Sequence, residues 1–421
     1  MVKDNLRIMV YHSDFSAVAG GGEAMALRTV KALKELGYDA ELSASFIDKN
    51  ILMQSMKNID LYIVPKILNL SNINIISSFF INKNILPSFW ITYTYKKIYD
   101  NIADELAHLK HEYDLILCMQ SPKPIMFGDV GYFHFPHFIL PMQSIYIPNS
   151  LNPFVKLYKL FLILFEYKIF KMTYKELFPK IFISNSTWTK NGLIKIYSKL
   201  EALGFKELSE AAKGSYIIYP SIDYEILAST YDPNSKRDLV LTVSRYNPAK
   251  NLWSIIYVAH DIPEAHFIIA GTTKEKKSFK VLAELEYLID KLRVKNVTLE
   301  KDVSRKRLVD LYKDAKVYLH PLYVEHFGIS IAEGAAAGAV PVVYKDGGGW
   351  LDIASRIDSM LGYKTVKEAA GIVKTLLQNH ELWQQLSRKA VILASTFSWS
   401  NFKYNLNNVI RYAVSIKRRP H

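Results

Sequence analysis

The sequence predicts an α/β protein built from two doubly wound domains, and three observations lead to this prediction. The chain has 421 residues, half of them hydrophobic and 22% charged, which is enough to bury two cores. It opens with an apolar strand, Leu6–Tyr11, followed by a glycine loop and a helix over Glu23–Leu36, the order in which doubly wound domains begin. From Leu239 onward, short apolar strands alternate with helical patterns, which favours a second parallel sheet.

The predicted boundary between the domains lies at residues 220–237, where Pro233 and Asn234 are turn signals. We therefore expect a first domain over residues 1–220 and a second over residues 221–399. A last helical pattern, Trp399–Ile416, follows the second domain and accounts for most of residues 400–421.

Composition excludes several classes of protein. The single cysteine, Cys118, rules out an internal disulfide and favours a reducing, cytoplasmic setting; it lies in the apolar run DLILCM and is expected in the core. No signal peptide and no apolar run long enough to cross a membrane is predicted. The net charge of +13 suits an anionic partner, but the basic residues are scattered and no nucleic-acid motif is present, so nucleic acid is not expected.

The most informative stretch runs from His320 to Asp352. It predicts a strand end, a loop, a small-residue helix over Gly328–Ala337, a second strand, and a glycine turn. Glu325 stands just before the helix and Glu333 inside it. Because the first turn of a helix favours a phosphate, an extended ligand with a central diphosphate could meet one carboxylate at each end, as a nucleotide-sugar would. The alternative is a helix cap at Glu325 and a solvated Glu333.

The motif EHFGISIAE resembles the E-x7-E signature of retaining GT-B glycosyltransferases of family four. Within that family, the EHFG box, the small-residue helix and the loop GGGWLDI are most similar to the α-1,2-mannosyltransferases of the dolichol pathway, which use GDP-mannose. Trp350 stands where those enzymes have proline. The resemblance implies a GT-B fold, in which two Rossmann-like domains face each other across a cleft and the last helix crosses back onto the N-terminal domain.

Three further motifs carry the resemblance: AGGGE near the start, GYFHFP in the first half, and SRYNPAKN after the first strand of the second half. A histidine such as His134 in an aromatic strand is usually a packed core residue, and lone basic residues are usually solvated. The resemblance implies otherwise, although Ala249 replaces a glutamate that relatives often carry. The residues implied to serve the reaction are His134, Arg245, Lys250 and Glu325. Those implied to hold the donor are Gly21, Gly22, Arg245, Lys250, His326, Phe327, Gly328, Ile329 and Glu333.

The reaction implied is transfer of a hexose, mannose from GDP-mannose, to a lipid-linked sugar of the dolichol type, with retention of configuration. No cofactor or catalytic metal is expected, because GT-B enzymes generally lack a catalytic metal and no Asp-x-Asp of the metal-dependent kind is visible. Two alternatives remain. One is a transferase of the same family that uses UDP-glucose or UDP-N-acetylglucosamine to make glycolipid or exopolysaccharide. The other is a non-catalytic member that binds a glycolipid or a partner transferase.

The segment Asn152–Phe178 is long, helical, aromatic and rich in lysine. It predicts either a buried helix pair or a surface that lies on an anionic membrane, where apolar side chains enter the interface and lysines meet lipid phosphates. The second interpretation places the protein on the cytoplasmic face of a membrane as a peripheral protein.

Overall fold

The computed structural model describes residues 6–16, 20–57, 59–68, 88–121, 126–136, 153–158, 160–162, 164, 177–201, 205–273 and 275–418. The chain divides into two compact units. The first contains Met1–Asn185, Thr189–Ile218 and Asn405–His421, and the second contains Ser186–Trp188 and Tyr219–Tyr404.

The first unit is built on a sheet whose described strands are all paired in parallel. In spatial order these strands are β5 (Lys66–Ile67), β3 (Asp39–Ala44), β1 (Arg7–His12), β6 (Leu115–Met119), β7 (Val130–Phe133), β8 (Ile181–Ser184) and β9 (Tyr216–Ile217). A small parallel pair lies beside it, β2 (Asp14–Phe15) and β4 (Phe46–Ile47). The accompanying helices are α1 (Gly21–Glu35), α2 (Lys49–Lys57), α4 (Ser88–Glu112), α6 (Thr187–Glu201) and α7 (Lys206–Lys213).

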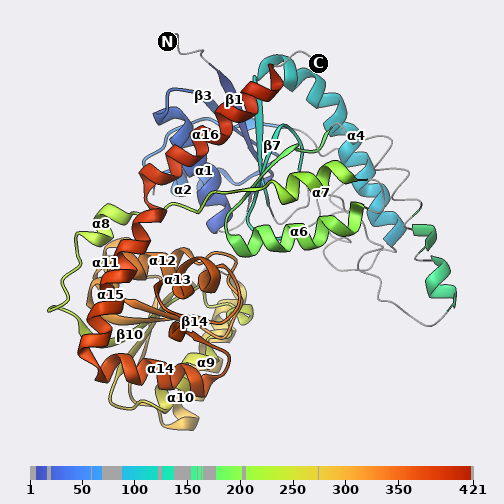
Figure 1. Cartoon of the computed structure of the whole chain (residues 1–421). Helices are drawn as coiled ribbons and strands as arrows, with labels where there is room; N and C mark the ends of the chain where they lie inside the picture. The colour runs from blue at the N-terminus through green and yellow to red at the C-terminus, as the bar shows by residue number, and fades with distance from the viewer. Residues whose placement is uncertain are drawn as a thin grey trace. The chain divides into compact units, whose positions relative to one another are not determined.

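The second unit contains another parallel sheet, and helices cover both of its faces (Figure 1). Its strands, in spatial order, are β12 (Val297–Lys301), β11 (His266–Gly271), β10 (Arg237–Val243), β13 (Ala315–Leu319), β14 (Val340–Tyr344) and β15 (Gly362–Tyr363). One face carries α9 (Trp253–His260), α10 (Lys276–Leu292) and α14 (Val366–Gln378); the other carries α8 (Tyr224–Ala228), α11 (Arg305–Asp314), α12 (Ile329–Ala336), α13 (Ser355–Ile357) and α15 (His380–Ala394).

Strand order confirms the predicted fold class. In both sheets the first strand of the unit lies inside the sheet and the chain winds outward from it, first to one side and then to the other. This is the doubly wound order, in which ligands bind beyond the carboxyl ends of the strands where the winding reverses. In the second unit the reversal lies between β10 and β13, whose neighbours along the sheet, β11 and β14, are mostly buried and apolar.

The final helix, α16 (Trp399–Lys417), begins in the second unit, and its residues from Asn405 onward belong to the first. In the first unit Tyr38 donates a hydrogen bond to Asn407 over 2.7 Å. Lys417 donates to the carbonyl of Asp114 over 2.8 Å. These contacts fix the last helix against the first sheet.

Several predicted elements differ from those observed. The predicted linker contains a short helix, α8, and Asp223, which precedes it, forms an ion pair with Arg305 of α11. The sequence predicts a helix over Ile98–His111, whereas α4 begins ten residues earlier, at Ser88. The third residue of the predicted glycine turn, Gly349, opens a π-helical turn that runs to Ala354. Most of Asn152–Phe178 lies outside the described residues.

One other prediction is confirmed within the part of the chain that the structure describes. Cys118 is fully buried, and burial raises the pKa of its thiol to about 12, so it is a core residue. No helix among these residues is both long and apolar enough to cross a membrane.

Candidate functional site

The carboxyl edge of the second sheet gathers three loops, each following a neighbouring strand. They are the loop after β10 with Arg245 and Lys250, the loop after β13 with Glu325 and His326, and the glycine loop after β14. Because parallel strands end at one edge, loops far apart in the sequence meet there.

The glycine loop supports the backbone of the EHFG box. The N–H of Gly348 donates to the carbonyl of Glu325 over 2.7 Å, and Gly347 pairs with Glu325 as an isolated bridge. Gly347 has a φ of +93°, and a Cβ there would lie 2.3 Å from the carbonyl oxygen of Glu325. A Cβ at Gly348 would lie 2.0 Å from the carbonyl oxygen of His326. The loop therefore lacks side chains because the EHFG backbone occupies their space.

Glu325 and Lys250 form an ion pair at this edge. Lys250 Nζ lies 2.7 Å from Glu325 Oε2, and His320 Nε2 lies 3.6 Å from the same oxygen. The other ring nitrogen of His320 lies 3.0 Å from the carbonyl oxygen of Pro321. Burial alone would raise the pKa of Glu325, but the hydrogen bonds and charges of His320 and Lys250 outweigh it and hold the pKa well below its usual range. Glu325 is thus a carboxylate at neutral pH.

Arg245 has a different partner. Its Nη1 lies 2.9 Å from Glu275 Oε1, at the residue that precedes α10, and its side chain is half-exposed. Glu275 also accepts a hydrogen bond from Asn247 over 2.8 Å. The structure therefore joins Lys250 to Glu325 directly, whereas Arg245 is held by Glu275 on the β11 side of the edge.

Glu333 is buried, with only 8% of its surface exposed, so the alternative of a solvated glutamate is wrong. Arg305 Nη1 lies 2.8 Å from its Oε1, and the hydroxyl of Tyr312 donates to its Oε2 over 3.0 Å. Burial raises the pKa of Glu333, and the charge of Arg305 opposes that rise. Both partners lie on α11, and sequence reasoning missed them.

The remaining residues of the EHFG box shape the start of α12. Gly328, predicted as the first residue of the helix, instead precedes it with a φ of +97° at the N-cap position, so Glu325 is not the residue that caps the helix. Phe327 is buried, and its ring packs against those of Tyr219 and Phe397 at centroid distances of 5.6 and 5.1 Å. Burial lowers the pKa of His326, which keeps its ring neutral at pH 7.

In the first unit, the predicted residues meet at the carboxyl edge of the first sheet. Gly21 and Gly22 form the first turn of α1, and His134 follows β7. A Cβ at Gly22 would lie 3.7 Å from Nε2 of His134 and 3.9 Å from Cε1 of His12. The fold therefore places the ring of His134 against the glycine turn.

Sequence reasoning missed three residues around His134. Gln120 accepts hydrogen bonds from the N–H groups of His134 and Phe135 over 2.8 and 3.0 Å. Asn185 donates to the carbonyl of His134 over 2.9 Å. His12 is fully buried beside the same turn, and burial lowers the pKa of its ring. A signal was available, because Gln120 and Asn185 directly follow β6 and β8 and His12 ends β1.

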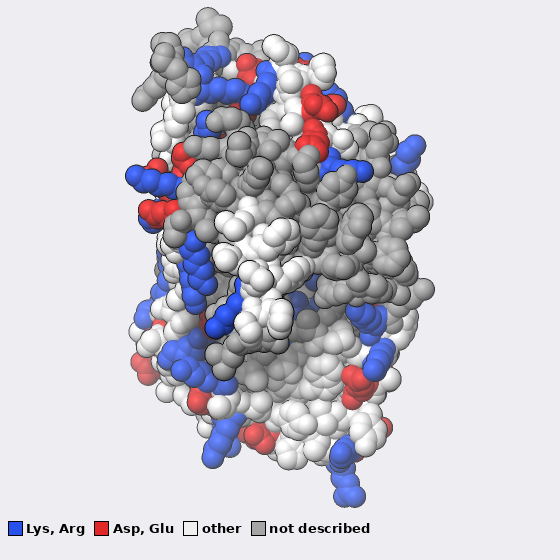
Figure 2. All heavy atoms as spheres, turned by 90° about the vertical axis from the view of Figure 1, so that its right-hand side faces the viewer, with Lys and Arg blue, Asp and Glu red and all other residues white. Residues whose placement is uncertain are grey.

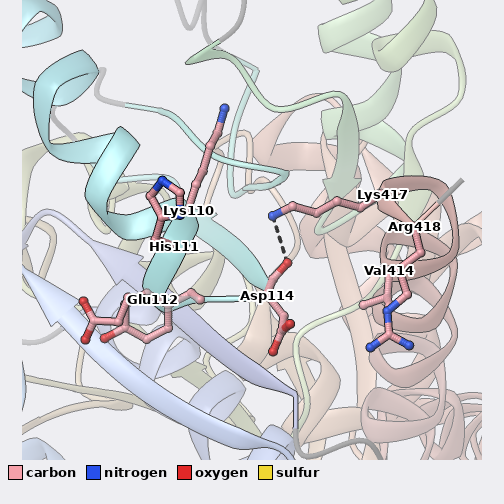
Figure 3. A pocket seen from close by; sticks show the side chains of 8 residues that line it. Lys110, His111, Glu112, Asp114, Val414, Lys417 and Arg418 are labelled. Carbon is pink, nitrogen blue, oxygen red and sulfur yellow. Dashed lines mark hydrogen bonds between the residues drawn. The ribbon is translucent and has the colours of Figure 1, made fainter. Parts of the chain in front are cut away.

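A cavity of about 350 Å³ lies away from these edges (Figure 3). It opens in the first unit between the end of α4, the start of β6 and the end of α16. It is lined by Lys110, His111, Glu112, Tyr113, Asp114, Val414, Lys417 and Arg418. Strands begin at this edge rather than end there, so the cavity is separate from the candidate site.

Residues 224–391 match the family model for glycosyl transferases group 1. The match includes Arg245, Lys250, Glu325 and Glu333. The second unit carries a group 1 glycosyltransferase domain. The sequence resemblance that placed this domain among the glycosyltransferases is therefore confirmed.

A curated relative is the GDP-Man:Man(3)GlcNAc(2)-PP-Dol alpha-1,2-mannosyltransferase of Dictyostelium discoideum. The chain is 25% identical to it over 266 residues, which cover 59% of this chain and 50% of that protein. The chain thus spans about half the length of this curated relative.

The fold is that of solved glycosyltransferases. A glycosyltransferase from Rickettsia africae matches with a TM-score of 0.64 at 15% identity, covering 99% of this chain and 100% of that one. The Anabaena protein HepE, solved in complex with UDP, matches with a TM-score of 0.65 at 16% identity, covering 97% of this chain and all of that one. The chain forms two units with parallel doubly wound sheets and returns to the first unit at its end. This is the GT-B architecture.

Proposed function

We propose that this protein transfers a hexose from a nucleotide-sugar to a lipid-linked sugar with retention of configuration, and that the hexose is mannose from GDP-mannose. The observation that carries the proposal is the pair of ionisable carboxylates around α12 inside the glycosyltransferase domain. Glu325 faces a lysine and Glu333 faces an arginine and a tyrosine. The relative from Dictyostelium discoideum, whose name states a GDP-mannose donor and a dolichol-linked acceptor, supports the choice of donor and acceptor.

In this proposal the donor lies along the carboxyl edge of the second sheet. Glu333 accepts hydrogen bonds from the ribose hydroxyls, and Glu325 accepts them from the hexose. The diphosphate lies between them, near the first turn of α12 and the cations of Arg245 and Lys250. Negative charge grows on the leaving diphosphate as the glycosidic bond breaks, and fixed positive charges there stabilise the transition state.

We further propose that the reaction uses no metal or other cofactor and follows a front-face route. The leaving phosphate would take the proton of the acceptor hydroxyl, and we propose that His134 and the glycine turn of α1 also bind substrate. Lys250 and Arg245 supply the positive charge that this route requires at the diphosphate. Activity that disappears with EDTA and returns with manganese would contradict this part of the proposal.

The decisive experiment is turnover of a panel of donors. The purified protein is incubated with GDP-mannose, UDP-glucose or UDP-N-acetylglucosamine and a dolichol-linked oligosaccharide, and glycolipid products are separated by mass. We expect product with GDP-mannose and none with Glu325→Gln, which removes the carboxylate but keeps the shape. If product forms only from a UDP-sugar, the donor is that sugar nucleotide and not GDP-mannose. If no donor gives product, the non-catalytic alternative is favoured.

We also propose that the protein acts as a peripheral protein on the cytoplasmic face of a membrane. The described part of the predicted membrane segment supports this, because Phe154, Leu157, Phe161 and Leu164 are exposed and recur at helical spacing. Figure 2 shows the side of the molecule that faces right in Figure 1, where lysine and arginine side chains occur among uncharged ones. Such a surface suits the lipid that would carry the acceptor.

A further inference from the structure

Helix α11 supplies a separate partner to each carboxylate oxygen of Glu333. Arg305 reaches Oε1 over 2.8 Å and the hydroxyl of Tyr312 reaches Oε2 over 3.0 Å. The two partners are seven positions apart, which is close to two helical turns, so they lie on one face of α11 about 10 Å apart along its axis. The carboxylate is therefore held at two points by one rigid element.

The helix itself is fixed in place. Ser304 caps its start by accepting a hydrogen bond from the N–H of Arg307 over 3.1 Å. Lys236 donates to the carbonyl of Tyr312 over 2.9 Å near its end. Arg305 is also anchored on its far side, because its Nη2 lies 2.9 Å from Asp223 Oδ2. Arg305 therefore cannot turn away from Glu333 without also losing Asp223, and Lys236 holds the backbone that carries Tyr312.

The number of acceptor positions suits a ribose. Each oxygen of an ionised carboxylate accepts two hydrogen bonds. Within the described part of the chain, one position on each oxygen of Glu333 is taken, by Arg305 or by Tyr312, which leaves one on each oxygen. A ribose presents two neighbouring hydroxyls, which match two parallel acceptors. This match holds only for the ionised form, because a proton on the carboxyl would convert one acceptor into a donor.

Burial of Glu333 works against that ionised form. The groups that face its carboxyl are the guanidinium of Arg305, the hydroxyl of Tyr312 and, beyond the arginine, the carboxylate of Asp223. Arg305 is the cation among them. Removal of its charge would leave a buried carboxyl beside a second acid, which favours the protonated form.

We infer that Arg305 and Tyr312 are positioning residues, which hold Glu333 ionised and oriented so that both of its free acceptor positions meet the donor ribose. The inference rests on the proposed function, because it takes the ligand of Glu333 to be a nucleotide. Arg305 acts through Glu333 rather than on the reacting atoms.

The test compares Arg305→Met with Arg307→Met. Both arginines lie on α11, both pair with a glutamate, and their side chains are 44% and 46% exposed. Arg307 pairs instead with Glu300, over 2.6 Å. Binding of GDP, 2′,3′-dideoxy-GDP, UDP and 2′,3′-dideoxy-UDP is measured by calorimetry at pH 7, and the melting temperature of each variant shows that it is folded.

We expect Arg305→Met to bind the ribonucleotide about five- to thirty-fold more weakly than wild type, because charged hydrogen bonds are replaced by neutral ones. Its affinity for the dideoxynucleotide should match that of wild type. Arg307→Met should bind both as wild type does, and Arg305→Lys should recover part of the loss. Tyr312→Phe should show the same selective loss, and it provides the answer if Arg305→Met does not fold.

Two outcomes would overturn the inference while leaving the proposed function intact. In one, wild type prefers the ribonucleotide and the Arg305 variant keeps that preference in full. In the other, the variant loses affinity for both nucleotides equally, which indicates a general structural role. If wild type binds no nucleotide, the proposed function fails and this inference fails with it.

Discussion

Lys250 is the basic residue most closely tied to the candidate chemistry, because its ammonium contacts Glu325 directly and also lies 4.2 Å from the ring centroid of Tyr323. Its side chain is 17% exposed, against 49% for Arg245. A cation held in a poorly solvated place stabilises developing charge more strongly than one in water.

Lys250→Met should therefore lower kcat more than it weakens donor binding. We expect a loss of about 10²–10³ in kcat, typical of removing one preorganised charge-stabilising group, and a smaller change in donor affinity. Steady-state kinetics and equilibrium binding of the donor measure the two quantities separately. Equal factors in both would mean that Lys250 binds the ground state and transition state alike. Arg245→Met provides the comparison, and we expect the same pattern with a smaller loss.

Gly348 is required by packing rather than by flexibility. A Cβ there would lie 2.0 Å from the carbonyl oxygen of His326 and 2.8 Å from Cα of Phe327, both backbone atoms. Gly348→Ala should therefore displace the EHFG backbone, cost about 1–3 kcal/mol of stability and abolish turnover.

The matched control for Gly348→Ala is Gly371→Ala in α14, where an added Cβ meets nothing within 4 Å. Alanine is the better helix former there by about 1 kcal/mol, so this variant should be slightly more stable and fully active. Melting temperatures and donor turnover of both variants measure these effects on stability and activity. An active, stable Gly348→Ala would show that the loop can move away from the EHFG box.

At the scale of elements, the sequence was most informative where local signals and tertiary structure agree. A serine before a helical pattern predicts a helix cap, and Ser304 caps the start of α11. A glycine after a helical pattern predicts a left-handed helix end, and Gly338, which follows α12, has a φ of +84°. Both are helix-capping positions, where one residue type is preferred for a local steric or hydrogen-bonding reason.

Elements and contacts that depend on distant residues could not be predicted in the same way. Helix α8 spans five residues and is too short to be stable alone. The ion pair between Asp223, which precedes it, and Arg305 is a tertiary contact that a local sequence pattern does not predict. The environment of Glu333 is another example, because Arg305 lies 28 residues earlier and only the packing of α11 brings it near. The motif therefore indicated the position of the site, and tertiary structure determined its charge state.

Lys236, in the segment before β10, donates a hydrogen bond to Tyr312 of α11. The free energy of burying its ammonium depends on pH. Lys236 is buried, and burial lowers the pKa of its ammonium to about 7. An unfolded lysine keeps a pKa near 10.4, so between pH 7 and pH 10 the unfolded chain binds more protons than the native one. Stability of the second unit should therefore rise with pH across this window.

Lys236→Met removes that titration. The stability of the variant relative to wild type should be greatest at pH 6–7 and should fall by about 2 kcal/mol between pH 7 and pH 9, since each unit of pH is worth about 1.4 kcal/mol. Denaturant unfolding at several pH values measures this difference. Lys280→Met, at an exposed position on α10, should show no such trend. A difference that does not change with pH would mean that Lys236 is already neutral, or still charged, throughout the range.

At the scale of the whole molecule, charge and exposed apolar surface point to the same partner. The chain carries a net charge of +13. Phe154, Leu157, Phe161 and Leu164 are between 54% and 80% exposed, and Lys156 lies among them. An anionic membrane offers both an apolar interface and negative charge, with about 1 kcal/mol gained for each basic residue near the surface.

The last prediction follows from this combination. Wild type should sediment with vesicles that contain phosphatidylserine, and binding should fall as salt rises from 50 to about 500 mM, because salt shortens the range of the charge attraction. A triple variant, Phe154→Ser with Leu157→Ser and Phe161→Ser, should lose most of this binding. The matched control is Phe279→Ser with Ile392→Ser, which removes two exposed apolar side chains from the second unit. If the triple variant folds normally and still sediments as wild type does, residues 153–164 are not the membrane surface.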